Sequence, residues 1–154
     1  MQAEGYLAVT PEGLVAQLRA GAGARVLAGP GPLRILSLDF DRKGGAVLSG
    51  GGRAGDAVSI LADGALRGHG SVDADGHFTL ALEEPLSEGP HRIEVVDGAD
   101  RVGMSANVTA AAPLINEPFR ANRVTEGWRI DWITPGGGAQ TTLLLSPQSE
   151  EGQP

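Results

Sequence analysis

The sequence contains no cysteine and only one lysine, Lys43. The absence of cysteine excludes disulfides and thiolate ligands for a metal. Because the other positive charges are scattered arginines, the chain has no basic cluster that would bind phosphates, and nucleic acid is not expected as a partner. The formal net charge of −7 also argues against docking on acidic lipid.

No apolar run approaches the ~18 residues of a membrane helix, so direct insertion into a membrane is not expected. Residues 1–4 show neither the basic start nor the apolar stretch of a signal peptide. Two locations follow from the two possible origins of Met1. The protein is cytoplasmic if Met1 is native, and it belongs to the periplasm or cell envelope if a signal peptide was removed.

Aromatic residues make up only 4% of the chain, whereas 24 of the 154 residues are glycine and 10 are proline. Long amphipathic helices need unbroken runs of good helix formers, which this composition does not supply. Frequent glycine between short apolar runs is typical of many short strands. The composition therefore predicts an all-β protein of about one domain.

Residues 1–32 are predicted to form an N-terminal arm with one short helix and a Gly/Pro linker. Three residue types suited to a helix start occur at Thr10, Pro11 and Glu12. An apolar stripe at helical spacing follows at Leu14, Val15 and Leu18. Gly21 and Gly23 then end a helix of roughly ten residues, which has to pack on another element to be stable.

Residues 33–112 are predicted to form a seven-stranded, immunoglobulin-like (Ig-like) β-sandwich. Turn signals recur roughly every 8–12 residues, and apolar residues alternate with polar or small ones between them. The expected strands lie at residues 33–38, 46–48, 57–61, 65–72, 77–82, 91–96 and 102–109. Asp63-Gly64 is the dipeptide expected in a tight hairpin turn.

Residues 113–146 are predicted to form a three-stranded β extension, and residues 147–154 a disordered polar tail. The three strands are expected at residues 119–124, 128–133 and 140–145.

Three spaced motifs resemble bacterial Ig-like repeats. Residues 55–64 resemble the pattern G-x-V-x-V-x-x-D-G, residues 73–80 follow D-x-D-G-x-[WF]-x-[LV], and residues 86–93 follow L-x-x-G-x-[HY]-x-[IL]. Together with residues 25–30, they look closest to the Ig-like domain of alphaproteobacterial envelope proteins that also carry a LysM peptidoglycan-binding module. The resemblance implies a spacer, stalk or adhesion module. No LysM-like segment is present, so peptidoglycan binding does not carry over.

No residues are predicted to be catalytic, to bind a cofactor or to bind a metal. Asp73-Ala74-Asp75-Gly76 resembles the start of a calcium loop but lacks the later ligands, so it is interpreted as a β-turn. His69, His77 and His91 lack the close spacing of metal ligands and are interpreted as strand-face or solvated side chains. No base is evident for a nucleophilic serine.

The strongest candidates for partner binding are Arg120, Arg123, Trp128, Arg129 and Trp132. Both tryptophans of the chain share one face of a predicted strand. If that face is covered, they form the core of the extension; if it is exposed, they make a rigid patch that binds a protein or stacks on sugar rings.

The sequence therefore predicts a non-catalytic structural or interaction module of the bacterial cell envelope. Its partner would be another envelope protein or a cell-wall glycan, bound through a sheet edge or the Trp/Arg hairpin. The alternatives are a carbohydrate- or peptidoglycan-binding module and, with less support, an accessory domain of a hydrolase.

Overall fold

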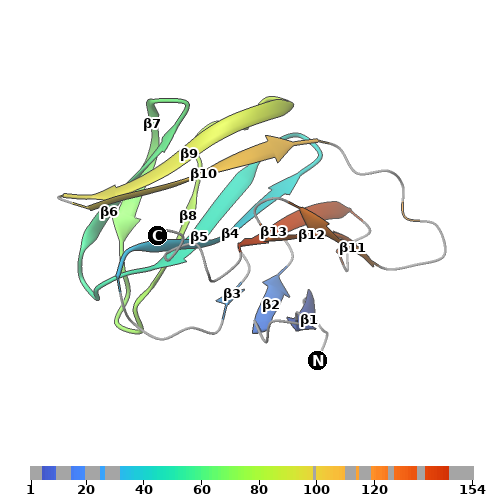
Figure 1. Cartoon of the computed structure of the whole chain (residues 1–154), viewed down its shortest axis with the longest axis horizontal. Helices are drawn as coiled ribbons and strands as arrows, with labels where there is room; N and C mark the ends of the chain where they lie inside the picture. The colour runs from blue at the N-terminus through green and yellow to red at the C-terminus, as the bar shows by residue number, and fades with distance from the viewer. Residues whose placement is uncertain are drawn as a thin grey trace.

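We describe a computed structural model of the chain, in which residues 5–9, 15–19, 25–26, 32–98, 100–109, 114, 119–124, 127–134 and 138–145 are placed. These residues form thirteen β-strands in three antiparallel sheets of six, four and three strands (Figure 1). Within the placed ranges there is no helix, and hence none long and apolar enough to cross a membrane. The all-β prediction is confirmed.

Seven of the strands build a two-layer sandwich. The four-stranded sheet has the order β10 (Asp100–Val108), β9 (Gly89–Asp97), β6 (Ala57–Ala62) and β7 (Ala65–Ser71). The facing sheet contains β4 (Arg34–Asp41), β5 (Ala46–Gly51) and β8 (His77–Ala81) side by side. All seven sandwich strands predicted from the sequence are present. Because β8 follows β7 in the chain but pairs with β5, the connection crosses between the sheets, as Ig-like sandwiches require.

The main hydrophobic core lies between these two sheets. Its largest fully buried members include Phe78, Leu38, Leu48, Ile60 and Ile93, which come from both sheets. The sandwich is closed on the side where β7 meets β8, where the Glu83 N–H donates to the Arg67 carbonyl at 2.8 Å and the Arg67 side chain pairs with Glu84 at 3.1 Å.

The C-terminal strands extend the sandwich sheet. β11 (Phe119–Val124), β12 (Gly127–Ile133) and β13 (Ala139–Leu145) occupy the ranges predicted for the extension. β13 pairs with β4, so the three strands complete one six-stranded sheet, in the order β11-β12-β13-β4-β5-β8. Leu143 of β13 lies opposite Leu38 and belongs to the main core. The core of the sandwich therefore depends on residues far beyond residue 112.

The predicted N-terminal helix is wrong. β1 (Gly5–Val9), β2 (Val15–Arg19) and β3 (Arg25–Val26) form a small three-stranded sheet instead. In β2, Ala16 and Leu18 are buried while Gln17 between them is exposed, which is the two-residue period of a strand. An apolar stripe this short is compatible with both the helical period of 3.6 residues and the two-residue period of a strand. Pairing with the neighbouring strands selects the strand. The predicted helix start at Thr10–Glu12 lies outside the described residues.

The Asp63-Gly64 hairpin turn is present as predicted. Both residues have positive φ, 53° at Asp63 and 86° at Gly64, as a type I′ turn requires. Asp63 is the one residue other than glycine with positive φ in the placed ranges.

Candidate functional site

The two tryptophans face the N-terminal sheet. Trp132 is 0% exposed and packs in a second, smaller core with Ala16, Leu18, Ile130 and Leu144. Its indole N–H donates to the Thr142 hydroxyl at 3.1 Å. A ring buried in this way offers no surface to a sugar or a partner protein.

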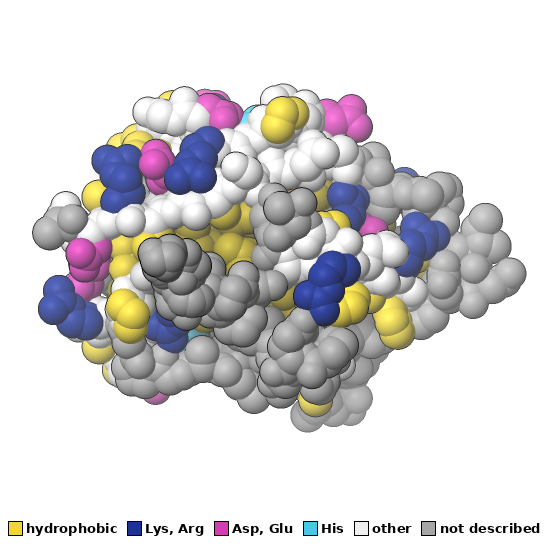
Figure 2. Space-filling view, in the orientation of Figure 1, with side chains coloured by type: hydrophobic (Ala, Val, Ile, Leu, Met, Phe, Trp, Pro, Cys, Tyr) yellow, Lys and Arg dark blue, Asp and Glu magenta, His cyan; other side chains and the backbone are white. Residues whose placement is uncertain are grey.

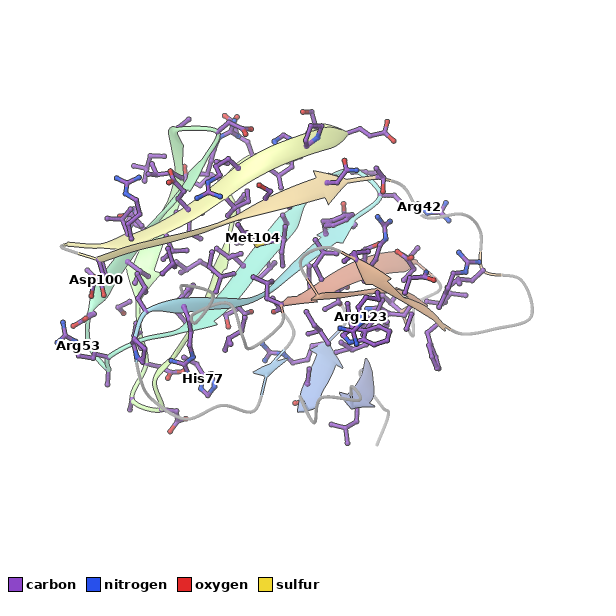
Figure 3. All side chains as sticks on the ribbon, viewed as in Figure 1. Arg42, Arg53, His77, Asp100, Met104 and Arg123 are labelled. Atoms are coloured by element: carbon purple, nitrogen blue, oxygen red, sulfur yellow. The ribbon has the colours of Figure 1, made fainter. Side chains whose placement is uncertain are left out.

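Trp128 is only partly buried, at the margin of the second core. The guanidinium of Arg123, opposite it on β11, lies 4.7 Å from the centroid of its ring, and Figure 3 shows Arg123 on the side of β12 nearest β2. Cation–π packing of this kind covers part of the indole. Arg120 faces the opposite side of the sheet, since it is opposite Asp131 in the register.

Arg129 points to the sandwich side of the sheet, away from the tryptophans. It pairs with Asp131 at 3.1 Å, donates to the hydroxyl and carbonyl of Thr109 at 2.6 and 2.7 Å, and lies over the ring of Phe40. Its side chain is 15% exposed. Arg129 therefore joins β12 to the chain directly after β10. The five candidate residues are divided between two faces: Arg123 packs on Trp128, both tryptophans belong to the second core, and Arg120 and Arg129 lie on the opposite face.

A series of hydrogen-bonded, buried polar side chains lies on the face of the six-stranded sheet that carries the tryptophans. Asp39, which is 2% exposed, accepts hydrogen bonds from Thr142 at 2.5 Å and from Gln140 at 2.8 Å. The Gln140 amide also donates to the Arg19 carbonyl of the N-terminal sheet at 3.0 Å. These bonds satisfy polar groups that the N-terminal sheet removes from water, so their role is structural.

The structure brings together a histidine, a carboxylate and a serine that the sequence analysis left apart. We call Asp63, His91 and Ser87 the His91 cluster. The ring Nδ1 of His91 lies 2.6 Å from Asp63 Oδ2, and Nε2 lies 2.6 Å from the Ser87 carbonyl and 3.4 Å from the Ser87 hydroxyl. The residues come from the β6–β7 turn, the start of β9 and the loop before it. The L-x-x-G-x-H motif contains two of them, but Asp63 lies 28 residues earlier in the chain.

The geometry of the His91 cluster does not suit nucleophilic catalysis. A general base needs a free nitrogen lone pair directed at the hydroxyl it deprotonates. Here both ring nitrogens lie at short distance from oxygen acceptors, so both donate, and the nearer acceptor at Nε2 is the carbonyl of Ser87. The cluster therefore joins two turns rather than activating a serine.

The protonation of the cluster follows from its contacts. Burial of the ring lowers the pKa of His91, but hydrogen bonds to Asp63 and to the Ser87 carbonyl, with the charge of Asp63, outweigh burial and raise the pKa above its ordinary value. The hydrogen bond from the Arg92 N–H, followed by that from His91, lowers the pKa of Asp63. Asp63 and His91 thus form an ion pair at mildly acidic pH.

The D-A-D-G segment forms the predicted turn. Asp73 Oδ1 accepts from the N–H groups of Asp75 and His77 at 2.9 and 3.0 Å, and Gly76 has a φ of 85°. Across the placed ranges, no group of three or more Asp, Glu or His side chains is arranged to hold a metal ion.

The strand β10 is one edge of the four-stranded sheet. It is nine residues long, pairs in unbroken register with β9, and has no described strand on its other side. From Val102 to Val108 it contains no charge, no proline and no bulge. Its alternate residues from Met104 onward are buried in the core (Figure 3). Edge strands of natural proteins usually carry a charge, a proline or a bulge, because an edge strand without them can pair with other chains.

The direction of the β10 backbone groups can be derived from β9. The Arg92 carbonyl accepts from the Asp63 N–H on the β6 side, so the next residues in β9, His91 and Ile93, direct their backbone groups to β10. Their register partners are Ala106 and Met104. The residues that alternate with them, Gly103, Ser105 and Asn107, therefore direct their backbone groups away from the sheet. All three residues are exposed as well.

Two other edge strands, β7 and β11, carry features that oppose pairing. β7 contains a bulge and contacts β8 across the closed side of the sandwich. β11 carries Arg120 and Arg123, and charges on an edge strand oppose pairing with another chain. Figure 2 shows hydrophobic side chains in the hollow beneath β10, and basic side chains both above this hollow and on the β11 side.

Comparison with known proteins identifies the sandwich. Residues 36–112 match a family model described as bacterial Ig domain, which covers nearly all of β4 and runs through β10. No curated protein and no solved structure gave a match. The Ig-like part of the sequence resemblance is confirmed, while the relationship to LysM-containing proteins stays a prediction. Domains of this kind are generally non-catalytic.

Proposed function

The chain belongs to the bacterial Ig domain family, and we propose that it is a non-catalytic structural and protein-interaction module of the bacterial cell envelope. It binds an extended segment of another envelope protein along β10. The observation that carries this proposal is the regular edge of β10, which has no neighbouring strand on its outer side among the described residues and carries no charge from Val102 to Val108. Its backbone groups at Gly103, Ser105 and Asn107 point outward. Main-chain pairing along such an edge provides affinity, and alternate side chains provide selectivity.

Two observations favour this edge over the Trp/Arg hairpin. Trp132 is buried and Trp128 is packed under Arg123, so neither tryptophan supplies the exposed aromatic anchor on which a binding patch or a sugar platform depends, and the exposed aromatic side chain of the hairpin is Phe119, at 49%. Arg129 is already bonded to Asp131 and Thr109. A cell-wall glycan is therefore less well supported as the partner than a polypeptide.

The experiment is co-sedimentation of the purified full chain with an envelope preparation from its native bacterium. Ser105→Pro removes an outward-facing N–H and places a ring on the pairing side, while an edge strand tolerates proline there. Ser105→Ala is the matched control, because it keeps the N–H. One lost main-chain hydrogen bond, about 1 kcal/mol, together with the steric block predicts at least about a tenfold loss of affinity for Ser105→Pro.

We expect Ser105→Ala and Trp128→Ala to bind as the wild type does, and Ser105→Pro to bind more weakly while keeping its far-UV circular dichroism. Equal binding by Ser105→Pro and wild type would exclude the β10 edge. Loss of binding with Trp128→Ala alone would indicate that the partner binds at the hairpin of β11 and β12 instead. Fractionation of the native cells tests the location: recovery of the protein from the cytoplasm contradicts the envelope assignment.

A further inference from the structure

We propose that the His91 cluster is a proton-controlled latch. While the His91 imidazole carries both ring protons, it holds the loop at residues 87–88 against the β6–β7 turn, and loss of one proton releases this loop. The inference concerns regulation at one end of the sandwich and is independent of partner binding at β10.

The hydrogen-bond geometry requires the charged ring. Nδ1 and Nε2 each lie 2.6 Å from an oxygen, one of the Asp63 carboxylate and one of the Ser87 carbonyl. A carboxylate and a carbonyl are both acceptors, so only an imidazolium, which donates from both nitrogens, satisfies both contacts. A neutral ring has one N–H. It keeps one contact and places a nitrogen lone pair against the oxygen of the other.

The bond that is lost on deprotonation is the one to Ser87. Asp63 is negatively charged and retains the remaining N–H of the ring more strongly than a neutral carbonyl does. Asp63 is itself fixed, because Oδ1 accepts from the Arg92 N–H at 2.9 Å. The hydrogen bond to the Ser87 carbonyl is therefore the one that breaks on deprotonation.

The charged groups around the ring are few. Asp63 on the β6–β7 turn favours the imidazolium, and Arg67 on β7 opposes it. Arg67 is paired with Glu84, which reduces its effect on the ring. The His91 side chain is 9% exposed, so its contacts are screened less by water than those of a surface histidine.

Loss of the hydrogen bond between His91 and Ser87 would release only the short segment at residues 87–88. Leu86 is buried and its N–H donates to the Gly44 carbonyl at 2.8 Å, which holds the loop independently of His91. Ser87 and Glu88 beyond it line a surface hollow of about 230 Å³ together with Arg42, Lys43 and Thr109. Figure 3 shows Arg42 at this end of the molecule, where β10 ends. The protonation of His91 thus sets the shape of one wall of the hollow.

The experiment is an NMR titration of the full chain between pH 5 and pH 9, which follows the ¹⁵N shifts of the His91 ring and the backbone amides of residues 86–88. We expect both ring nitrogens to be protonated at pH 6, and a single transition above the ordinary histidine pKa of about 6.5. The amides of Ser87 and Glu88 should shift and exchange faster with the same midpoint, while the Leu86 amide stays protected.

Two variants separate the latch from a general effect of pH. Asp63→Asn removes the charge but keeps a residue that tolerates positive φ, and it should lower the His91 midpoint. His69→Gln alters an exposed histidine of β7 and should leave both transitions unchanged. A neutral His91 ring at pH 6, a midpoint at or below 6.5, or Ser87 and Glu88 amides that do not follow the ring would each overturn the proposal, and the wild-type titration alone is sufficient to show them.

Discussion

Leu143→Ala tests whether the C-terminal strands are an integral part of the sandwich. Leu143 lies on β13, outside the residues matched by the Ig family model, yet it is 3% exposed and packs in the main core opposite Leu38. Truncating a buried leucine to alanine costs about 2–5 kcal/mol, because the transfer free energy of the removed atoms is lost and a cavity remains. We expect about 3 kcal/mol here.

That loss is large compared with a typical total stability of about 5–15 kcal/mol. For a chain of this size it corresponds to a fall in Tm of roughly 6–12 °C. The assay is urea unfolding followed by two signals. Far-UV circular dichroism reports on all the sheets, and tryptophan fluorescence reports on β12 alone, since both tryptophans lie in that strand.

Coincident transitions, both shifted to lower urea concentration, are expected if the six-stranded sheet unfolds as one unit. Leu66→Ala is the control, because Leu66 is 60% exposed and its truncation should change stability by less than about 0.5 kcal/mol. Two separate transitions, with the main circular dichroism change unmoved by Leu143→Ala, would show that the C-terminal strands form an independent unit and would refute the reasoning.

Three further predictions concern single contacts. Arg129→Met leaves Asp131 buried without its cation and should cost about 2–4 kcal/mol in urea unfolding; adding Asp131→Asn should restore part of the loss, and no restoration would contradict the ion-pair role. Gly50→Ala places a Cβ in steric clash with the Arg34 carbonyl oxygen and should destabilise the fold by about 2 kcal/mol or more, measured in the same way. The raised pKa of His91 means that its contribution to stability is complete below about pH 6.5 and is lost as the pH rises through the folded-state pKa, while the lowered pKa of Asp63 means that its contribution is lost only in acid. Tm measured against pH should therefore fall above about pH 6.5 in the wild type, and His91→Gln should remove that fall.

The sandwich was predictable because its signals are local. Alternating apolar residues and turn dipeptides such as Asp63-Gly64 specify strands and hairpins without reference to distant residues. The N-terminal arm was mispredicted for the same reason. Leu14, Val15 and Leu18 lie in a segment too short to fix a period, and pairing of β1, β2 and β3 decided the outcome.

The candidate sites depended on contacts that local patterns do not carry. Strand alternation predicts that the two tryptophans share a face, but it gives no sign that the N-terminal sheet covers this face or that Arg129 on the other face bonds to Thr109. The bond between Thr142 and Asp39 joins residues 103 positions apart. The Asp63–His91 contact likewise depends on the pairing of β6 with β9. A free edge becomes visible only when the order of strands in the sheet is known, so β10 had no individual signal in the sequence.

The most direct test of the proposed function is a photo-crosslinking scan in living cells of the native bacterium. A photoreactive residue is placed in turn at Ser105 and Asn107 on β10, at Thr79 on β8, at Leu66 on β7 and at Phe119 on β11, all of them exposed in the structure. Binding along β10 predicts a discrete crosslinked envelope protein from Ser105 and Asn107, and none from the other three positions. Crosslinking from Phe119 with none from β10, or equal crosslinking from all five positions, would contradict recognition through this edge.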